Sequence, residues 1–350
     1  SGANLTFANT IDGGFDLTLN SVGLTNLQGA IGSTTPLSSL TTDALGSTQV
    51  SGNITTVGDI TIADSLTLLN DATFTSANGN INLLNVTGTG QSLILNTATT
   101  GTTTLDGAIV LNQLIPSNSG ILNLSGSVST IADLTVNQAI VLLGDTTIDT
   151  GISNLTLNNE VDGGFTLVLN SVGITSLNGA IGSTTALANL TTNLGGTTQL
   201  GANLTTADGN LTFNDDVALT ENSTLTTGLG NLIFAGLIDG AFNLILNSGG
   251  LTDLLGAIGS TLALAGFTTN GGGTTRLRQN ITTSDGAIAL NDRVLLTGNV
   301  ALSSGSGSIT VADQVDGSFD LILNSTGSTD LRGAIGSTTA LASLTTDAVG

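Results

Sequence analysis

One motif returns at a nearly constant spacing through the chain, and this repetition limits the folds open to it. The segment from Asp12 to Asn20 recurs at 162–170, 239–247 and 316–324, and an eroded copy ends at Asn96. The final Asn of these copies recurs after 76, 74, 77 and 77 residues. A second marker, Gly-Ala-Ile, keeps the same period and begins at Gly29, Gly107, Gly179, Gly256 and Gly333. The sequence predicts one continuous domain over residues 1–350, in units of about 77 residues at approximately 1–77, 78–150, 151–227, 228–304 and 305–350, the last one partial.

Apolar and polar residues alternate within each unit. Phe15, Leu17 and Leu19 are apolar, whereas Asp16 and Thr18 between them are polar. This period of two is typical of a β-strand and predicts that the three apolar side chains point inward. The joints between such runs are rich in Gly, Asn, Asp and Ser, which favour tight turns. We therefore expect an all-β chain without helices.

Short strands at this spacing predict a parallel β-helix, or β-solenoid, in which each coil packs on the next. The spacing of Gly-led strands gives coils of roughly 19–21 residues, hence about 18 coils in the chain and about four in each unit. Inward Leu, Ile, Val and Phe form the expected core. Ser1 aligns with Gly305, and Gly350 aligns with Gly46, so the pattern starts and stops partway through a unit. We expect a segment of a longer chain.

The composition excludes several classes of function. The chain has no Cys and no His, which excludes disulfides and thiolate zinc sites and removes the most common general base. Its 25 acidic residues face only four Arg and no Lys, and the net charge of −21 disfavours nucleic acid as a partner. No apolar stretch approaches the roughly 18 residues of a transmembrane helix. We expect no enzyme activity, and no catalytic, cofactor-binding or metal-binding residue.

Strands such as Gly209-Asn-Leu-Thr-Phe and Asn80-Ile-Asn-Leu-Leu, joined by Asn and Gly turns, resemble those of the filamentous haemagglutinin-type exoproteins and related autotransporter adhesins of bacteria. The resemblance covers nearly the whole chain and lies in its general texture, not in a diagnostic motif. It implies a right-handed parallel β-helix, an extracellular or cell-surface location, and a stalk or filament role in adhesion or matrix building. It supplies no functional residue.

Two recurrent loops are candidates for ion binding. An Asp precedes Gly at one corner of four units, at Asp12, Asp162, Asp239 and Asp316. Calcium needs several oxygen ligands, and a second carboxylate follows in only two copies, as Asp16 and Asp320. The loop Gly29-Ala-Ile-Gly-Ser-Thr-Thr has the Gly content of a phosphate-binding loop but lacks the Lys and the following helix. We interpret both features as structural corners.

Three other patterns have a functional and a structural interpretation. The pair Asp215-Asp216 offers two carboxylates for glycoside hydrolysis, but neighbours on a strand point to opposite faces. The same rule separates Thr55 from Thr56 and argues against an ice-binding face. Triplets of the form Asn-x-Thr or Asn-x-Ser, which accept glycans in exported proteins, begin at Asn4, Asn53, Asn85, Asn123, Asn154, Asn189, Asn203, Asn210, Asn222 and Asn280. We favour the structural interpretation in each case.

Two surface features concern partners. The outward middle position of the recurrent strand is apolar in four of five copies, at Thr18, Ile94, Val168, Ile245 and Ile322. Such a stripe on one side indicates packing against another copy, although β-propensity alone also explains it. All four Arg lie late in the chain, at Arg276, Arg278, Arg293 and Arg332. We expect them to be solvated, with pairing to the acidic face of a second copy as the alternative.

The favoured function is a non-catalytic structural shaft of a large exported bacterial surface or filament protein. Its expected partners are other copies, packed side by side or end to end, and a host or matrix surface. The first alternative is an adhesive binding module, whose binding loop would lie in the irregular stretch between Leu69 and Asn137, around Pro116. The second alternative is a β-helical enzyme that acts on polysaccharides.

Overall fold

The computed structural model describes residues 3–117, 120–270 and 272–347. These residues form 38 strands and no helix, arranged as a parallel β-solenoid of about 16 turns. The all-β parallel solenoid predicted from the sequence is confirmed. Ser1 and Gly350, which served to align the chain ends, lie outside the described residues. Within the three described ranges, no helix is long and apolar enough to cross a membrane.

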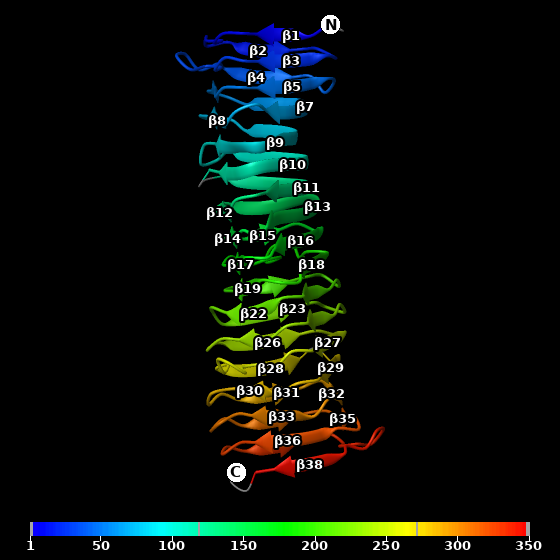
Figure 1. Ribbon diagram of the computed structural model, residues 1–350. Coiled ribbons are helices and arrows are strands. Elements are labelled where there is room, and N and C mark those ends of the chain that lie inside the picture. Colours follow the sequence, from blue (N-terminus) through cyan, green and yellow to red (C-terminus); the bar gives the residue numbers. More distant parts are fainter. Residues whose placement is uncertain (1–2, 118–119, 271, 348–350) are drawn as a thin grey trace. The chain divides into compact units, whose positions relative to one another are not determined.

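The chain divides into two compact units, Ser1–Phe165 and Thr166–Gly350, and each is a stack of coils (Figure 1). The single continuous domain over residues 1–350 stays a prediction. The strands of the first unit are β1 (Leu5–Phe7), β2 (Asp16–Leu19), β3 (Leu24–Leu27), β4 (Ser39–Thr42), β5 (Ser47–Val50), β6 (Ile54–Thr56), β7 (Ile60–Leu68), β8 (Ala72–Ser76), β9 (Ile81–Asn96), β10 (Thr102–Pro116), β11 (Ile121–Thr130), β12 (Leu134–Val136), β13 (Ala139–Gly151), β14 (Leu155–Leu157) and β15 (Val161–Asp162).

The second unit contains the remaining strands. They are β16 (Thr166–Ser171), β17 (Ile174–Leu177), β18 (Asn189–Thr192), β19 (Thr197–Leu200), β20 (Leu204–Thr205), β21 (Leu211–Phe213), β22 (Asp216–Leu219), β23 (Ser223–Thr226), β24 (Leu232–Phe234), β25 (Ile238–Asp239), β26 (Asn243–Asn247), β27 (Leu251–Leu254), β28 (Gly266–Asn270), β29 (Thr274–Leu277), β30 (Ile281–Thr282), β31 (Ile288–Leu290), β32 (Arg293–Leu296), β33 (Val300–Ser303), β34 (Ile309–Val311), β35 (Val315–Asp316), β36 (Asp320–Asn324), β37 (Thr329–Leu331) and β38 (Ser343–Thr346).

Strands of the second unit pair in three parallel columns, which we call faces 1, 2 and 3. Face 1 consists of β16, β18, β21, β24, β27, β29, β32 and β35. Face 2 consists of β17, β19, β22 and β25 and continues through single bridges at Ile258 to β30, β33, β36 and β38. Face 3 consists of β20, β23, β26, β28, β31, β34 and β37. The chain therefore visits three faces in each coil.

The first unit also stacks in columns, but several of its strands are longer. β2 and β4 lead to the beginning of β7, β3 and β5 lead to its end, and β6 and β8 lead to the end of β9. With 16 and 15 residues, β9 and β10 are the longest strands of the described chain. They lie within 69–137, where the sequence suggested a binding loop. The described part of this region is built mainly of strands; residues 118 and 119, next to Pro116, lie outside the description.

Coils differ in length, and this corrects the number expected from the sequence. Hydrogen-bonded residues one coil apart are separated by 19, 21 or 23 residues in different coils. The coil from Thr166 to Asn189, with a separation of 23, contains the Gly-Ser-Thr loop after Gly-Ala-Ile. The estimate of about 18 coils of roughly 19–21 residues was therefore too high, and the solenoid has about 16 turns.

Successive repeats place the same strand on different faces of the second unit. The strand with the recurrent Asn is β16 on face 1, β26 on face 3 and β36 on face 2. β26 directly precedes β27, which is the fourth strand after β16 in the column of face 1. One repeat is thus one face short of four complete coils, instead of the four short coils predicted.

The core follows the alternation of each strand. In β16, Leu167 and Leu169 are buried and Val168 between them is partly exposed. Phe213 stacks on its register partner Phe234 with ring centroids 5.0 Å apart. The prediction that Phe15 points inward is wrong, because its side chain is 81% exposed. It belongs to the turn before β2, where its N–H donates to Gly13 O at 2.9 Å.

Candidate functional site

The recurrent Asp and the Gly-Ala-Ile loop, which the sequence presents as separate features, meet in the folded chain. Asp12 Oδ1 accepts the backbone N–H groups of Thr34 and Thr35 at 2.7 and 3.1 Å. The same pair of bonds reaches Asp239 from Thr261 and Leu262, and Asp316 from Thr338 and Thr339. Each of these carboxylates holds a loop 22 to 23 residues further along the chain.

In this arrangement, the carboxylate of Asp12 occupies the backbone N–H groups of the candidate phosphate-binding loop. The amide groups that would bind a phosphate donate instead to a carboxylate of the same chain. The loop also depends on its second Gly: Gly259 has a φ of +67°, and a Cβ there would lie 2.0 Å from Thr282 O. These observations support the interpretation of the loop as a structural corner.

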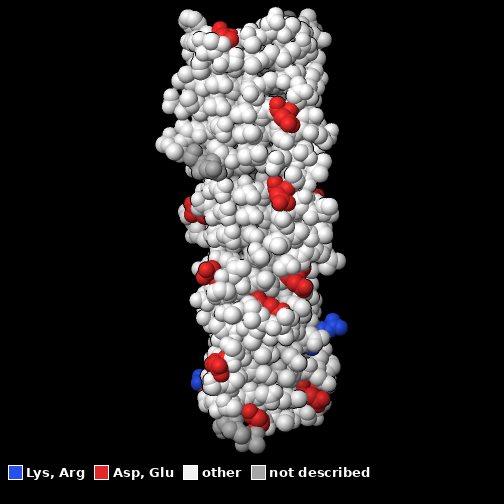
Figure 2. Space-filling view, turned by 60° about the vertical axis from the view of Figure 1, so that its left-hand side comes forward, with Lys and Arg blue, Asp and Glu red and all other residues white. Residues whose placement is uncertain are grey.

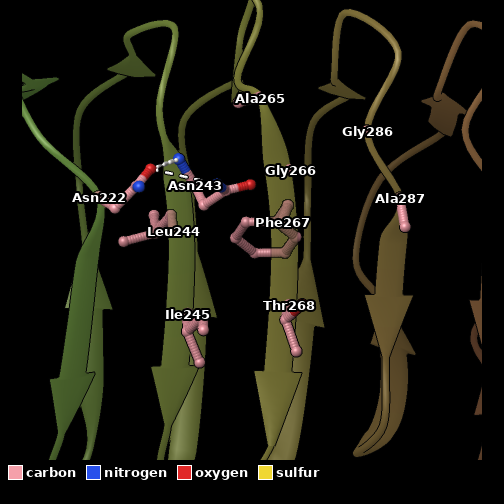
Figure 3. A pocket seen from close by; sticks show the side chains of 10 residues that line it. All are labelled: Asn222, Asn243, Leu244, Ile245, Ala265, Gly266, Phe267, Thr268, Gly286 and Ala287. Carbon is pink, nitrogen blue, oxygen red and sulfur yellow. Dashed lines mark hydrogen bonds between the residues drawn. The ribbon is translucent and has the colours of Figure 1, made fainter.

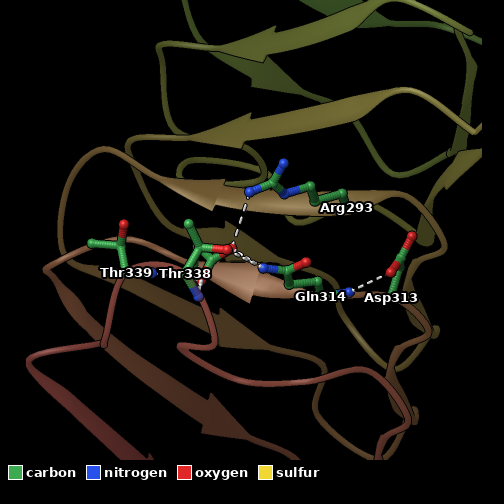
Figure 4. A network of polar contacts seen from close by, with 6 residues as sticks. Arg293, Asp313, Gln314, Thr338 and Thr339 are labelled. Atoms are coloured by element: carbon green, nitrogen blue, oxygen red, sulfur yellow. Dashed lines mark hydrogen bonds and ion pairs between the residues drawn. The ribbon is translucent and has the colours of Figure 1, made fainter.

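The carboxylate of Asp316 has donors on both oxygens. Oδ1 accepts the two loop amides, and Oδ2 accepts Arg293 Nη2 at 3.1 Å and Gln314 Nε2 (Figure 4). These hydrogen bonds, above all the one from the Thr339 N–H, lower the pKa of Asp316. A calcium ion would have to compete with donors of the protein for both oxygens.

The second carboxylates of the calcium hypothesis are also engaged. Asp16 Oδ1 accepts the hydroxyl of Ser39 at 2.7 Å, and Asp320 Oδ1 accepts that of Ser343 at 2.6 Å. Asp162 lies in β15 and is 9% exposed. The described chain contains no group of three or more His, Cys, Asp or Glu side chains placed to hold a metal ion. The recurrent acids act as caps for loops and side chains.

Asp215 and Asp216 differ in exposure and in the groups that they bind. Asp215 is 4% exposed and accepts the hydroxyls of Thr192 and Thr198 at 2.6 and 2.8 Å. Asp216 is exposed and accepts the N–H of Leu237 at 2.7 Å. Hydrolysis of a glycosidic bond needs two accessible carboxylates that flank the same bond, and in this pair one carboxylate is buried and both accept hydrogen bonds from the chain.

Most Asn residues of the glycan-acceptor triplets have a structural contact that sequence reasoning missed. Asn210 Oδ1 accepts the N–H of Asn231 one coil later at 2.9 Å, and Asn231 Oδ1 accepts the N–H of Leu251 at 2.8 Å. Equivalent bonds from a side-chain oxygen to the next coil are made by Asn4, Asn53, Asn85, Asn189, Asn203, Asn222 and Asn280. Exposed Asp residues do the same, including Asp59, Asp133 and Asp208. We call these contacts the amide ladder.

The apolar outer stripe is not a stripe. Val168, Ile245 and Ile322 belong to β16, β26 and β36, which lie on faces 1, 3 and 2 of the second unit. In the first unit, Thr18 lies in β2 and Ile94 near the end of β9, in different columns. Their equal spacing in the sequence suggested that these residues lie on one side of the solenoid, because each repeat was expected to contain four complete coils.

Three of the four Arg form ion pairs inside the chain, which the sequence did not predict, although the side chains of Arg293 and Arg332 stay 45% and 63% exposed and hence solvated. Arg276 binds both carboxylate oxygens of Asp253, with Nε to Oδ1 at 2.7 Å. The other two pairs are Arg293–Asp316 at 3.1 Å and Arg332–Asp330 at 2.7 Å. Arg278 is exposed and forms no ion pair with a described residue. On the face in Figure 2, acidic side chains lie in separate patches.

A shallow groove of about 380 Å³ lies on face 3, where Gly266, Gly286 and Ala287 leave space beside larger neighbours. Ile245 and its register partner Thr268 lie side by side on one of its walls (Figure 3). Asn222 Oδ1 accepts from Asn243 at the other end. Its lining contains no charged residue, so it has no groups for acid–base chemistry.

Sequence reasoning also missed a set of buried acids, Asp64, Asp215 and Asp292, as a group. Each follows a pair of Thr residues in the preceding coil, as Asp215 follows Thr192 and Thr198. The recurrence of two Thr and one Asp at this spacing in three repeats is the signal that reveals them.

No protein-family model, no curated protein and no solved structure matches the chain.

Proposed function

We propose that the chain is a non-catalytic structural segment, the repeat shaft of a large exported bacterial protein that lies on the cell surface or forms an extracellular filament. The observation that carries this proposal is the use of the recurrent polar residues. They bind the backbone of the next coil and do not converge on a common centre.

The amide ladder supports a load-bearing role. Parallel pairing already joins each coil to the next, and the side-chain oxygens of Asn and Asp add a second set of bonds between the same coils. Consecutive members share residues, because Asn210 both donates its N–H to Asn189 and accepts from Asn231. In a repeat array, stability grows from such nearest-neighbour contacts, so length can increase without a new core.

Export to the cell surface is proposed on the resemblance in texture to filamentous exoproteins. The chain has no Cys, which is compatible with any redox compartment. Its many Thr, Asn and Gly residues suit a structural role in stacked coils joined by turns. Packing between copies stays a prediction. The outer apolar residues no longer support this prediction, since Val168, Ile245 and Ile322 lie on three different faces.

Location is tested with antibodies raised against the folded chain and applied to intact and permeabilised source cells. Labelling of intact cells is expected, and protease added outside should release fragments that carry these repeats. A cytoplasmic protein that is labelled only after permeabilisation serves as the control. If this chain behaves like that control, export is rejected.

The shaft role is tested by removing one repeat, residues 228–304, from the native protein. A shaft should become shorter in electron micrographs while whatever lies beyond it stays exported and active. The matched control removes 151–227, and both deletions should act alike. If one deletion abolishes binding to cells or matrix and the other does not, the missing repeat holds a binding site and the shaft proposal is wrong.

A further inference from the structure

Apart from Asp162, the buried carboxylates of the described residues are of two kinds. Asp253 and Asp316 are 5% and 1% exposed and pair with Arg276 and Arg293. The second kind binds threonine hydroxyls, and no described Arg pairs with it. Its members are Asp64, Asp215 and Asp292, which are 2%, 4% and 1% exposed. A buried carboxylate without a cation is costly to ionise.

The site at Asp215 shows the geometry. The carboxylate lies below the loop that joins β18 to β19 in the preceding coil, and the Thr at either end of that loop donates to it. Thr192 Oγ1 also accepts the N–H of Asn214 at 3.3 Å. Because an N–H can only donate, the hydroxyl proton of Thr192 remains for the carboxylate.

The site at Asp64 repeats this arrangement in the first unit. Thr42 and Thr48 donate to Asp64 Oδ1 at 3.1 and 2.9 Å, and Thr42 Oγ1 accepts the N–H of Ala63 at 3.1 Å. The two Thr again stand at the ends of a loop, between β4 and β5.

The third site keeps one hydroxyl and adds a backbone donor. Asp292 Oδ2 accepts Thr275 Oγ1 at 3.2 Å, and Oδ1 accepts the N–H of Gly272 at 3.1 Å. Asp64, Asp215 and Asp292 lie one in each of the repeats 1–77, 151–227 and 228–304. The described part of the repeat 78–150 contains no buried acid.

The charged neighbours do not neutralise these sites. Asp43 faces Asp64, Asp216 follows Asp215, and Asp313 faces Asp292, each adding a like charge. The residue after Asp292 is Arg293, which is bound to Asp316. The other contacts from the packed coils are neutral hydroxyl and amide groups.

We propose that Asp64, Asp215 and Asp292 are proton-uptake sites, one in each of three repeats, through which mild acid stabilises the folded coils. Protonation removes the buried charge. The carboxyl group gains a hydroxyl donor, which the Thr hydroxyl without a backbone donor, Thr198 at Asp215 and Thr48 at Asp64, can accept after it rotates.

The direction of the pKa shifts agrees with the burial of these carboxyls, which outweighs the opposite effect of the hydrogen bonds that they accept. Burial raises the pKa of each of the three carboxyls above its ordinary value of 3.8. A group with a raised folded-state pKa contributes its full stabilisation below the ordinary value and loses it as the pH rises through the folded-state pKa. Stability should therefore increase as the pH falls from neutral towards 3.8. Asp316, whose pKa is lowered, loses its contribution only at lower pH, as the pH falls through its folded-state value.

The test is the midpoint of thermal unfolding of the whole chain, followed by circular dichroism between about pH 7 and pH 4. We expect the midpoint to rise by about 2 °C or more as the pH falls, and to stay level in the triple variant Asp64→Asn, Asp215→Asn, Asp292→Asn. The matched control is Asp59→Asn, Asp133→Asn, Asp208→Asn, which removes the same charge from exposed members of the amide ladder and should keep the rise. A wild-type midpoint that does not rise, or an equal rise in the buried triple variant, overturns the proposal.

If the triple variant does not fold, infrared spectroscopy of the wild type and of the single variant Asp215→Asn tests whether the buried carboxyl is protonated. The C=O band of a protonated carboxyl should appear in the folded wild type above the ordinary pH range of Asp and should be weaker in the variant. A band that appears only below about pH 4 contradicts the proposal. This result is independent of where the protein is located in the cell.

Discussion

Asp239 Oδ1 accepts the backbone N–H of Thr261 at 3.0 Å, and this bond joins the two sequence markers of the repeat. The Asp is the last residue of β25, shortly before the recurrent strand β26, and the Thr comes from the loop after Gly-Ala-Ile one coil later. Two motifs that look like separate ion-binding loops are thus the donor and acceptor sides of one corner. The same contact recurs 77 residues later, between Asp316 and Thr338.

Replacing Asp239 by Ala should destabilise the chain by about 1–2 kcal/mol, because the N–H groups of Thr261 and Leu262 lose their acceptor. Asp239→Asn keeps an oxygen at the same place and should cost less. Urea unfolding gives the stability, and hydrogen exchange of the two amides gives the local effect. Equal exchange rates in the Ala variant and the wild type would show that the bond does not hold the loop.

Gly259→Ala should be among the most damaging single-methyl changes in the second unit. A Cβ would lie 2.0 Å from Thr282 O, and the φ of +67° is unfavourable for other residues. We expect a loss of more than about 2 kcal/mol. Gly164→Ala is the control, since nothing lies within 4 Å of its Cβ position. If both variants unfold at the same urea concentration, the corner is more adaptable than its geometry indicates.

Asn210→Ala should cost about 1 kcal/mol, because it removes the acceptor for the Asn231 N–H. Asn210→Asp should be nearly neutral in this respect, since Asp59 and Asp208 make the same bond naturally. Both variants also remove the glycan-acceptor triplet that begins at Asn210. Mass spectrometry of the native protein shows separately whether Asn210 carries a glycan. A large loss with Asp as well as with Ala would mean that the amide nitrogen, not the oxygen, matters.

Arg276→Gln should destabilise the second unit by about 1–2 kcal/mol, because it leaves the carboxylate of Asp253 buried without its cation. The pair is worth less than a fully buried one, since the Arg side chain is 36% exposed. Arg278→Gln removes the same charge from a neighbouring exposed position and should be neutral. Thermal unfolding at low and high salt compares the two variants. Equal midpoints for Arg276→Gln and Arg278→Gln would contradict a stabilising role of the Arg276–Asp253 pair.

The strands and the parallel stacking could be predicted because both depend on local patterns. Alternation at Leu17 and Leu19 identifies a strand, and Gly and Asn mark its ends, so the fold class follows without knowledge of distant contacts. The inward prediction for Phe15 failed because alternation does not show where the strand begins. β2 starts one residue later, after the turn at Gly13.

The faces could not be predicted, because they depend on accumulated coil lengths. An error of two residues in one coil, as between 21 and 23, moves every later residue relative to the faces. Val168 and Ile245 therefore seemed to share a side and do not. The Arg276–Asp253 pair was missed for the same reason: the residues are 23 positions apart and become neighbours only when β27 and β29 pair in this register.

The mismatch between repeat and coil in the second unit has a genetic consequence. Each repeat stops one face before closing four coils, so gaining or losing a single copy by recombination would rotate all downstream surfaces by a third of a turn. Three copies together restore the original orientation. Changes in copy number would then alter which residues are presented to the surroundings as well as the reach of the molecule, without a single point mutation.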